Sequence, residues 1–205
     1  QNHSISVWND GNAIPIRKHE WQEDEDASMK DTSLYEHELI FGYLDSSSNF
    51  DDDKKDRKGG GLHGLGAKLV NIFADEFIAE GHANGQKIVI KWTNNMGEQS
   101  VPKITSLKNG KDYTKITYTL DFKRFGETGY SENILAVMKK MCIDCATCTG
   151  LKVYFTVSGE EPELLKPKNF MEYVSMFTLA NNKEKLEFKS SDSTLIVCEK
   201  SEYEP

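Results

Sequence analysis

Apolar and polar residues alternate in several short stretches of this chain, the pattern of a β-strand with one buried face. The clearest example covers residues 87–92, where Ile88, Ile90 and Trp92 share one face. Residues 115–122 repeat the pattern, with an apolar side chain at every second position. Further strands are expected at residues 5–8, 77–83, 152–157 and 194–198.

Four other segments have the spacing of amphipathic helices. From Gly64 onward, an apolar face is predicted by Leu65, Leu69, Ile72 and Phe73. The other predicted helices cover residues 34–44, residues 131–146 with Ser131 as N-cap, and residues 169–178. Strands in one mixed or antiparallel group, with helices gathered on one face, make a two-layer α+β sandwich.

Two polar segments interrupt this pattern. Residues 16–38 contain an acidic run at residues 23–26 and are expected to form a solvated insertion loop. Residues 45–61 are polar and end in three glycines, which predicts a second loop before the helix.

Composition narrows the class of protein. The chain has 205 residues, of which 38% are hydrophobic and 28% charged, as in soluble globular domains. Neither a membrane-spanning run nor a secretory signal is recognisable, so no membrane partner is expected. The formal net charge of -8 argues against a surface built mainly to bind a phosphate backbone. Four cysteines without an export signal favour free thiols in a reducing compartment.

The end of the first strand carries an unusual polar side chain. Alternation places Asn9 on the same face as Ile5 and Val7, so its amide is expected to point towards the core. A strand followed by a turn explains the Asn, Asp, Gly and Pro residues that follow. A buried amide nevertheless needs partners, and a ligand could be one of them.

The glycine-rich segment before the second helix suggests a phosphate site. The P-loop pattern fails because Ala67 precedes Lys68 and Leu69 follows it. The dinucleotide fingerprint fails because no strand precedes the glycines. Two interpretations remain, namely a loop that binds an anion at a helix N-terminus and a flexible hinge before a helix.

The cysteines leave two interpretations open. Cys142, Cys145 and Cys148 are spaced by three, and Cys198 could complete a zinc or iron–sulfur site. On a helix this spacing brings only neighbouring pairs together, which favours unligated thiols. The histidines show no metal-binding spacing, and the acidic runs are expected to be solvated.

Several segments together resemble one protein family. They are WNDGNAIPI, ELIFGYLDSSSNFDDDKK, GGGLHGLGAKLVNIFADEF, QKIVIKW and YTKITYTLDFKRFG, in this order. They resemble the ATP-binding domain of type IIA DNA topoisomerases of the eukaryotic and large-DNA-virus type. That domain has the GHKL, or Bergerat, fold, which gyrase B, heat-shock protein 90, histidine kinases and MutL share.

The resemblance implies a domain plan. Residues 1–205 would form a GHKL ATP-binding domain that is incomplete at its N-terminus, with its end uncertain over residues 178–205. Residues 16–38 would be an acidic insertion, and residues 45–68 would form the ATP lid and the start of its helix.

The resemblance also implies roles for single residues. Asn9 would read the adenine amino group, and Thr114 would support the far side of the base. Gly11, Ile14 and Pro15 would shape the adenine pocket. The loop that reaches ribose and phosphates would contain Ser47, Ser48 and Asn49. The lid around the triphosphate would contain Gly61, Leu62, His63, Gly64, Leu65, Gly66, Ala67 and Lys68.

One departure from the family pattern lies in the adenine pocket. Ala13 stands where the family usually has glycine. A Cβ atom there costs little if φ is negative, but it could crowd the base or strain the turn.

The resemblance implies a function for the parent enzyme. ATP with Mg²⁺ would close a homodimer gate and drive passage of duplex DNA, which other domains would bind. The enzyme would be nuclear in a cellular eukaryote, and cytoplasmic or in the virion for a virus. The general-base Glu and the Mg²⁺-binding Asn are expected upstream of Gln1, so this chain is expected to contribute neither catalytic nor metal-binding residues. Alone it would have no ATPase activity and at most weak nucleotide affinity.

Two alternatives remain at this point. The chain could be another GHKL ATPase, of the chaperone or mismatch-repair type. It could also be an interaction module of the same fold that has lost its nucleotide.

Overall fold

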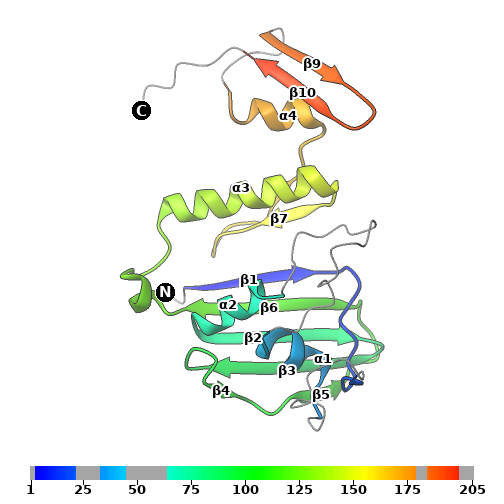
Figure 1. Cartoon of the computed structure of the whole chain (residues 1–205), viewed down its shortest axis with the longest axis vertical. Coiled ribbons are helices and arrows are strands. Elements are labelled where there is room, and N and C mark those ends of the chain that lie inside the picture. The colour runs from blue at the N-terminus through cyan, green and yellow to red at the C-terminus, as the bar shows by residue number, and fades with distance from the viewer. Residues whose placement is uncertain (1–2, 22–32, 45–63, 179–183, 199–205) are drawn as a thin grey trace. The chain divides into compact units, whose positions relative to one another are not determined.

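The computed structural model describes residues 3–21, 33–44, 64–178 and 184–198 (Figure 1). The chain divides into two compact units, Gln1–Gly129 and Tyr130–Pro205. Each unit is considered by itself below. No helix within these described ranges is both long and apolar enough to cross a membrane.

Unit 1 is built on an antiparallel sheet with strand order β1-β6-β2-β3-β4, in which β5 also pairs with β3. The strands are β1 Ser4–Asn9, β2 Ala74–Ala83, β3 Gln86–Thr93, β4 Glu98–Gln99, β5 Lys103–Ser106 and β6 Tyr113–Leu120. The four strands expected in this half of the chain are confirmed, whereas β4 and β5 were not expected. Residues 121–122 leave the predicted strand, because the chain turns into a 3₁₀ helix, η1 Phe122–Phe125, which the Asp121 side chain caps.

A two-residue turn joins the central strands β2 and β3. Its residues, Asn84 and Gly85, have φ values of 51° and 75°, and Ala83 pairs with Gln86 across the turn. Positive φ at both central positions is the geometry of a type I′ hairpin, for which Asn-Gly is the preferred sequence. The turn therefore fixes the register of the two strands that form most of the core.

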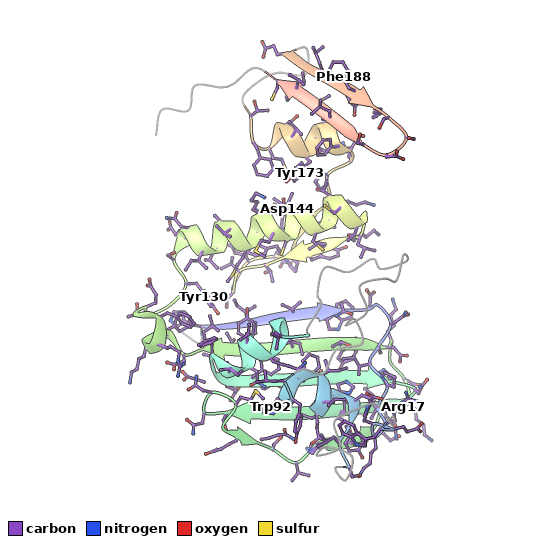
Figure 2. The ribbon with its side chains drawn as sticks, in the orientation of Figure 1. Arg17, Trp92, Tyr130, Asp144, Tyr173 and Phe188 are labelled. Atoms are coloured by element: carbon purple, nitrogen blue, oxygen red, sulfur yellow. The ribbon has the colours of Figure 1, made fainter. Side chains whose placement is uncertain are left out.

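The two faces of the sheet differ in chemistry. One face carries Phe77, Ala79, Ile88, Ile90 and Trp92, all buried, which form the core with Phe41 and Ala74. Of these residues, Trp92 is labelled in Figure 2. The other face is polar and carries ion pairs between Glu80 and Lys87 and between Glu76 and Lys91. An antiparallel sheet commonly has one packed face and one solvated face, and this division confirms the α+β class for unit 1.

Two short helices cover the core face, α1 Glu36–Gly42 and α2 Gly66–Ile72 (Figure 1). Both helices were predicted, but the buried face of α2 was not. Leu69 is 47% exposed, while Lys68 and Asn71 are buried. Hydrogen bonds offset part of the cost of this burial: Asn71 Nδ2 donates to Phe41 O at 3.0 Å and Lys68 Nζ donates to Gly64 O at 2.8 Å. Asn71 Oδ1 has no partner within the described residues.

Unit 2 contains two helices and two hairpins. They are α3 Glu132–Thr149, β7 Val153–Phe155, β8 Glu163–Leu165, α4 Phe170–Ser175, β9 Lys185–Lys189 and β10 Thr194–Cys198. The expectation that all strands form one group is wrong for this unit. Strands β7 and β10 pair instead with β8 and β9, which are close to them in sequence and were not expected.

The helices of unit 2 begin where the sequence predicts. Ser131 Oγ accepts a hydrogen bond from Ile134 N at 3.3 Å and caps α3, as expected. Asn169 caps α4 in the same way. Tyr173 on α4 donates to Asp144 Oδ1 on α3 at 2.7 Å, which ties the two helices together (Figure 2).

A close approach between α1 and the sheet occurs at Gly81 in β2. A Cβ atom at this position would lie 2.3 Å from Nε2 of the buried His37. We therefore expect Gly81→Ala to lower the free energy of unfolding by about 1–3 kcal/mol, because the ring or the strand must move. Thermal denaturation followed by circular dichroism measures the effect.

Gly66→Ala serves as the control, since a Cβ atom at Gly66 meets no atom within 4 Å. This variant should be at least as stable as the wild type, because alanine favours the helix. A Gly81→Ala protein as stable as Gly66→Ala would contradict the packing described here.

Candidate nucleotide-binding site

Asn9 and Thr114 lie directly opposite each other at the ends of β1 and β6. Asn9 Nδ2 donates to Thr114 O over 3.5 Å, at the long end of the hydrogen-bond range. Because residues opposite each other in a ladder share a face, both side chains belong to the face that α1 and α2 cover. Two residues that are 105 positions apart in sequence are thus brought together.

The expectation that the Asn9 amide is buried is wrong, although its predicted face is correct. Its strand neighbours Ile5 and Val7 pair with Tyr118 and Ile116, which pack against the core. Asn9 itself is exposed, and Val7 is 57% exposed. The reason is that β1 is an edge strand, and the core residues of the described part lie on its inner neighbours.

The segment after β1 turns back towards the same face. A Cβ atom on Gly11 would lie 3.6 Å from Asn9 Oδ1, so the turn stays close to the amide. Ile14 packs against the core cluster, while Pro15 is exposed. Ala13 is absent from the residues with positive φ, so its Cβ does not strain the turn.

The lid residues fall partly within the described structure. Gly64 has a φ of 61°, and the chain then enters α2 through Leu65, Gly66 and Ala67. Lys68 is buried, and its ammonium group donates to the carbonyl oxygen of Gly64. Ala67 packs against the same core cluster as Ile14. The remaining predicted residues lie outside the described ranges: Ser47, Ser48, Asn49, Gly61, Leu62 and His63.

Sequence reasoning also missed a buried histidine on this face. His37 on α1 has no exposed surface, and neither of its ring nitrogens has a hydrogen-bond partner within the described residues. Burial lowers the pKa of His37 to about 4, although the nearby Glu36 carboxylate opposes the shift. The available signal was Gly81, because a glycine inside a strand often marks a close approach of another group.

The sequence and the structure of the chain were compared with those of known proteins. No family model matches the chain. It is 41% identical to DNA topoisomerase 2 of Saccharomyces cerevisiae over 188 residues, which cover 90% of this chain and 12% of that protein. The ATPase region of the same yeast enzyme, solved bound to ICRF-187, superposes with a TM-score of 0.77 at 39% identity, covering 92% of this chain and 47% of that one.

The chain is homologous to the ATPase region of DNA topoisomerase 2. The ATPase and transducer domains of topoisomerase II from Balamuthia mandrillaris agree, with a TM-score of 0.78 at 32% identity over 98% of this chain and 48% of that one. The ATPase domain of gyrase B from Thermus thermophilus, at 17% identity and a TM-score of 0.63 over 92% of this chain and 45% of that one, shows the shared fold alone. The expected GHKL fold and topoisomerase resemblance are therefore confirmed.

The three clustered cysteines lie on α3, outside the segments that carry the topoisomerase motifs. Cys142 is half-buried, and Cys145 and Cys148 are exposed. Burial, with Cys145 nearby, raises the pKa of the Cys142 thiol. Within the described residues, no three histidine, cysteine or carboxylate side chains are grouped so that they could hold a metal ion. The zinc or iron–sulfur hypothesis thus gains no support from the described residues.

A hollow of about 220 Å³ lies in unit 2, between α3 and the hairpin of β7 and β8. It is lined by Leu135, Ala136, Lys139, Phe155, Val157, Glu160, Glu161 and Glu163. None of the residues implied by the topoisomerase resemblance lies there. The candidate nucleotide site is therefore placed in unit 1, at Asn9, Thr114 and Lys68, and not in this hollow.

The depressed pKa of His37 makes stability depend on pH. Between its unfolded pKa near 6.5 and about 4, the unfolded chain binds a proton that the folded chain does not. Acidification therefore favours unfolding. We expect the titration of His37 to lower the free energy of unfolding by about 2 kcal/mol when the pH falls from about 7.5 to about 5. Urea denaturation at both pH values measures this loss.

His37→Leu removes the titrating group and should reduce the pH dependence by that amount. The difference between the two proteins isolates His37 from the other groups that titrate in this range. Equal pH dependence in the wild type and the variant would show that His37 is not held neutral in the folded chain.

Proposed function

We propose that this chain is the nucleotide-binding part of a type IIA DNA topoisomerase. In the whole enzyme, ATP binding would close a homodimer gate and drive passage of duplex DNA, which other domains would contact. The observation that carries this proposal is the Asn9–Thr114 pair, formed at the positions implied for adenine recognition in a chain 41% identical to yeast DNA topoisomerase 2.

The contact between these two residues supports a role for Asn9 as the hydrogen-bond acceptor for the base. Asn9 Nδ2 faces the Thr114 carbonyl oxygen. The carboxamide oxygen Oδ1 is then available to accept a hydrogen bond from the exocyclic amino group of adenine. Gly11 carries no side chain beside Oδ1, so a flat base can approach this atom. An amino group at this position distinguishes adenine from guanine, which presents a carbonyl oxygen there.

Lys68 supplies the positive charge of the proposed site. Its ammonium group lies at the start of α2 and donates to Gly64 O, within the segment implied to wrap the triphosphate. We propose that a phosphate oxygen takes this position when ATP binds, since a charge-assisted bond to an anion is stronger than one to a neutral carbonyl. The glycines allow the backbone to follow the phosphates closely.

Mg²⁺ would neutralise charge that develops on the phosphates during hydrolysis. The described residues contain no group of three or more histidine, cysteine or carboxylate side chains that could hold a metal ion. Mg²⁺ that is bound to phosphates and water needs fewer protein ligands than that. We assign no metal ligand and no general base to the described residues. The chain would bind nucleotide and, by itself, leave it uncleaved.

The comparisons favour a topoisomerase over a chaperone or a mismatch-repair ATPase, because the reported relatives that share more than 30% identity carry topoisomerase names. A nucleotide-free module of the same fold is the competing outcome of the experiments below. Titrations followed by NMR suit them, since they detect the weak affinity expected for the isolated chain.

Asn9→Ala tests the base contact. We expect it to weaken binding of both a non-hydrolysable ATP analogue and adenosine by roughly tenfold, because one hydrogen bond to the base is lost. Asn12→Ala is the matched control, since Asn12 is exposed in the same turn and has no assigned role. If the wild-type chain binds no nucleotide at millimolar concentration, the nucleotide-free module is the correct description.

Lys68→Gln tests the phosphate contact separately. The variant keeps a donor for Gly64 O but loses the positive charge. Affinity for the ATP analogue should fall by roughly tenfold or more, while affinity for adenosine stays unchanged, because only the phosphates are charged. Lys91→Gln, on the opposite face of the sheet, is the control. Equal losses for both ligands would argue that Lys68 acts only on the fold of α2.

A further inference from the structure

His37 is a buried histidine without a structural partner. Its ring has no exposed surface, and in the part of the chain that the structure describes both Nδ1 and Nε2 lack hydrogen bonds. Buried polar side chains in native proteins are nearly always hydrogen-bonded, so such an exception needs an explanation. The lowered pKa means that the ring is neutral at pH 7 and offers one N–H donor and one lone pair.

The second buried histidine of unit 1 does have a hydrogen-bond partner. His82 in β2 places Nε2 3.0 Å from Leu107 O, and its ring stacks on Tyr113. Its Nδ1 lies 3.3 Å from Asp112 Oδ1 but makes no hydrogen bond within the described residues. This ring is held by the loop before β6. His37 has nothing comparable, although it is buried to the same degree. Burial alone therefore does not account for a histidine at position 37.

The position of His37 connects it with the candidate nucleotide site. Asn9 pairs with Thr114, and Thr114 pairs with Gly81, so the three residues form a row across β1, β6 and β2. Directly paired residues share a face of the sheet. The Cβ atom that Gly81 lacks would point at the His37 ring, which therefore stands on this row. Neighbouring strands are about 5 Å apart, so the ring lies one strand spacing beyond Thr114.

We propose that His37 is a specificity-determining residue of the nucleotide site, where its neutral ring forms a hydrogen bond with the edge of the purine base. The proposal rests on the proposed function, because it needs a base beside Asn9 and Thr114. The bond forms directly or through a water molecule held between the ring and the base.

The chemistry of the two partners is complementary. An adenine edge presents an amino donor beside a ring-nitrogen acceptor, and a neutral imidazole presents one donor and one acceptor. Asn9 satisfies the amino group from one side, and His37 approaches from the far side of Thr114. Gly81 is necessary for this arrangement, since any side chain there would occupy the space of the ring. One of the two unpaired nitrogens of His37 is then explained as a group that the ligand satisfies.

The closing experiment records imidazole ¹⁵N resonances of the 205-residue chain labelled at histidine. The chain is titrated with a non-hydrolysable ATP analogue and, separately, with inorganic tripolyphosphate. We expect the His37 nitrogens to shift with the analogue and to stay in place with tripolyphosphate. His82 serves as the internal control, because its Nε2 already lies 3.0 Å from the Leu107 carbonyl oxygen and its side chain belongs to the opposite face of the sheet.

A variant gives an independent measurement. His37→Leu should weaken binding of the analogue by about tenfold without lowering the unfolding midpoint, because it removes two unpaired polar atoms from the core. A purely structural histidine would change the midpoint and leave the affinity intact.

Two negative outcomes are distinguishable. Binding itself is detected by shifts of the Asn9 amide in a second, uniformly ¹⁵N-labelled sample. If the analogue binds while the His37 nitrogens stay in place and His37→Leu binds equally well, the inference about His37 is wrong and the proposed function survives. If no analogue binds at all, the proposed function and the inference fall together.

Discussion

The position of β2 between β6 and β3 determines where every other element of unit 1 lies. Its core face carries Phe77 and Ala79, which are buried against Trp92 and Ile90 of β3. Its other edge holds β6, which in turn holds β1. The candidate site lies at the outer end of this chain of pairings, so its geometry depends on a strand that contributes only Gly81 to it.

Phe77 and Gly81 lie on the same face of β2 but have different roles: Phe77 packs in the core, and Gly81 leaves space for the His37 ring. At Phe77 a large side chain fills the space between sheet and helices, and its ring packs against Trp92 and Phe41. Four residues further, Gly81 leaves that space open, and a polar ring from α1 occupies it. The same face is therefore an apolar core at one end and a polar row at the other, and nucleotide chemistry is expected only at the polar end.

The alternating pattern predicted most of unit 1 because each face of its sheet has a different environment. Ile88, Ile90 and Trp92 alternate with polar residues for this reason, and all three are buried. The same rule predicted the face of Asn9 but not its exposure, since periodicity carries no information about which strand lies at an edge. It also failed for α2, where Lys68 and Asn71 are buried because specific carbonyl groups accept their hydrogen bonds. Gly64 is only four residues from Lys68, but Phe41 is 30 residues from Asn71. Periodicity cannot predict such a distant acceptor, nor the contact of His37 with Gly81.

The separation of 105 residues between Asn9 and Thr114 has a consequence for folding. The hairpin of β2 and β3 closes over a two-residue turn, and β6 joins it within the same half of the chain. Strand β1 must come from far away in sequence, which carries a larger loop-closure cost than these local pairings. The Asn9–Thr114 pair, which we propose reads adenine, is therefore expected to be among the last contacts to form. A chain that binds nucleotide would then be one in which the whole of unit 1 has folded. A bound nucleotide would in turn stabilise β1, the edge strand that pairs only with β6.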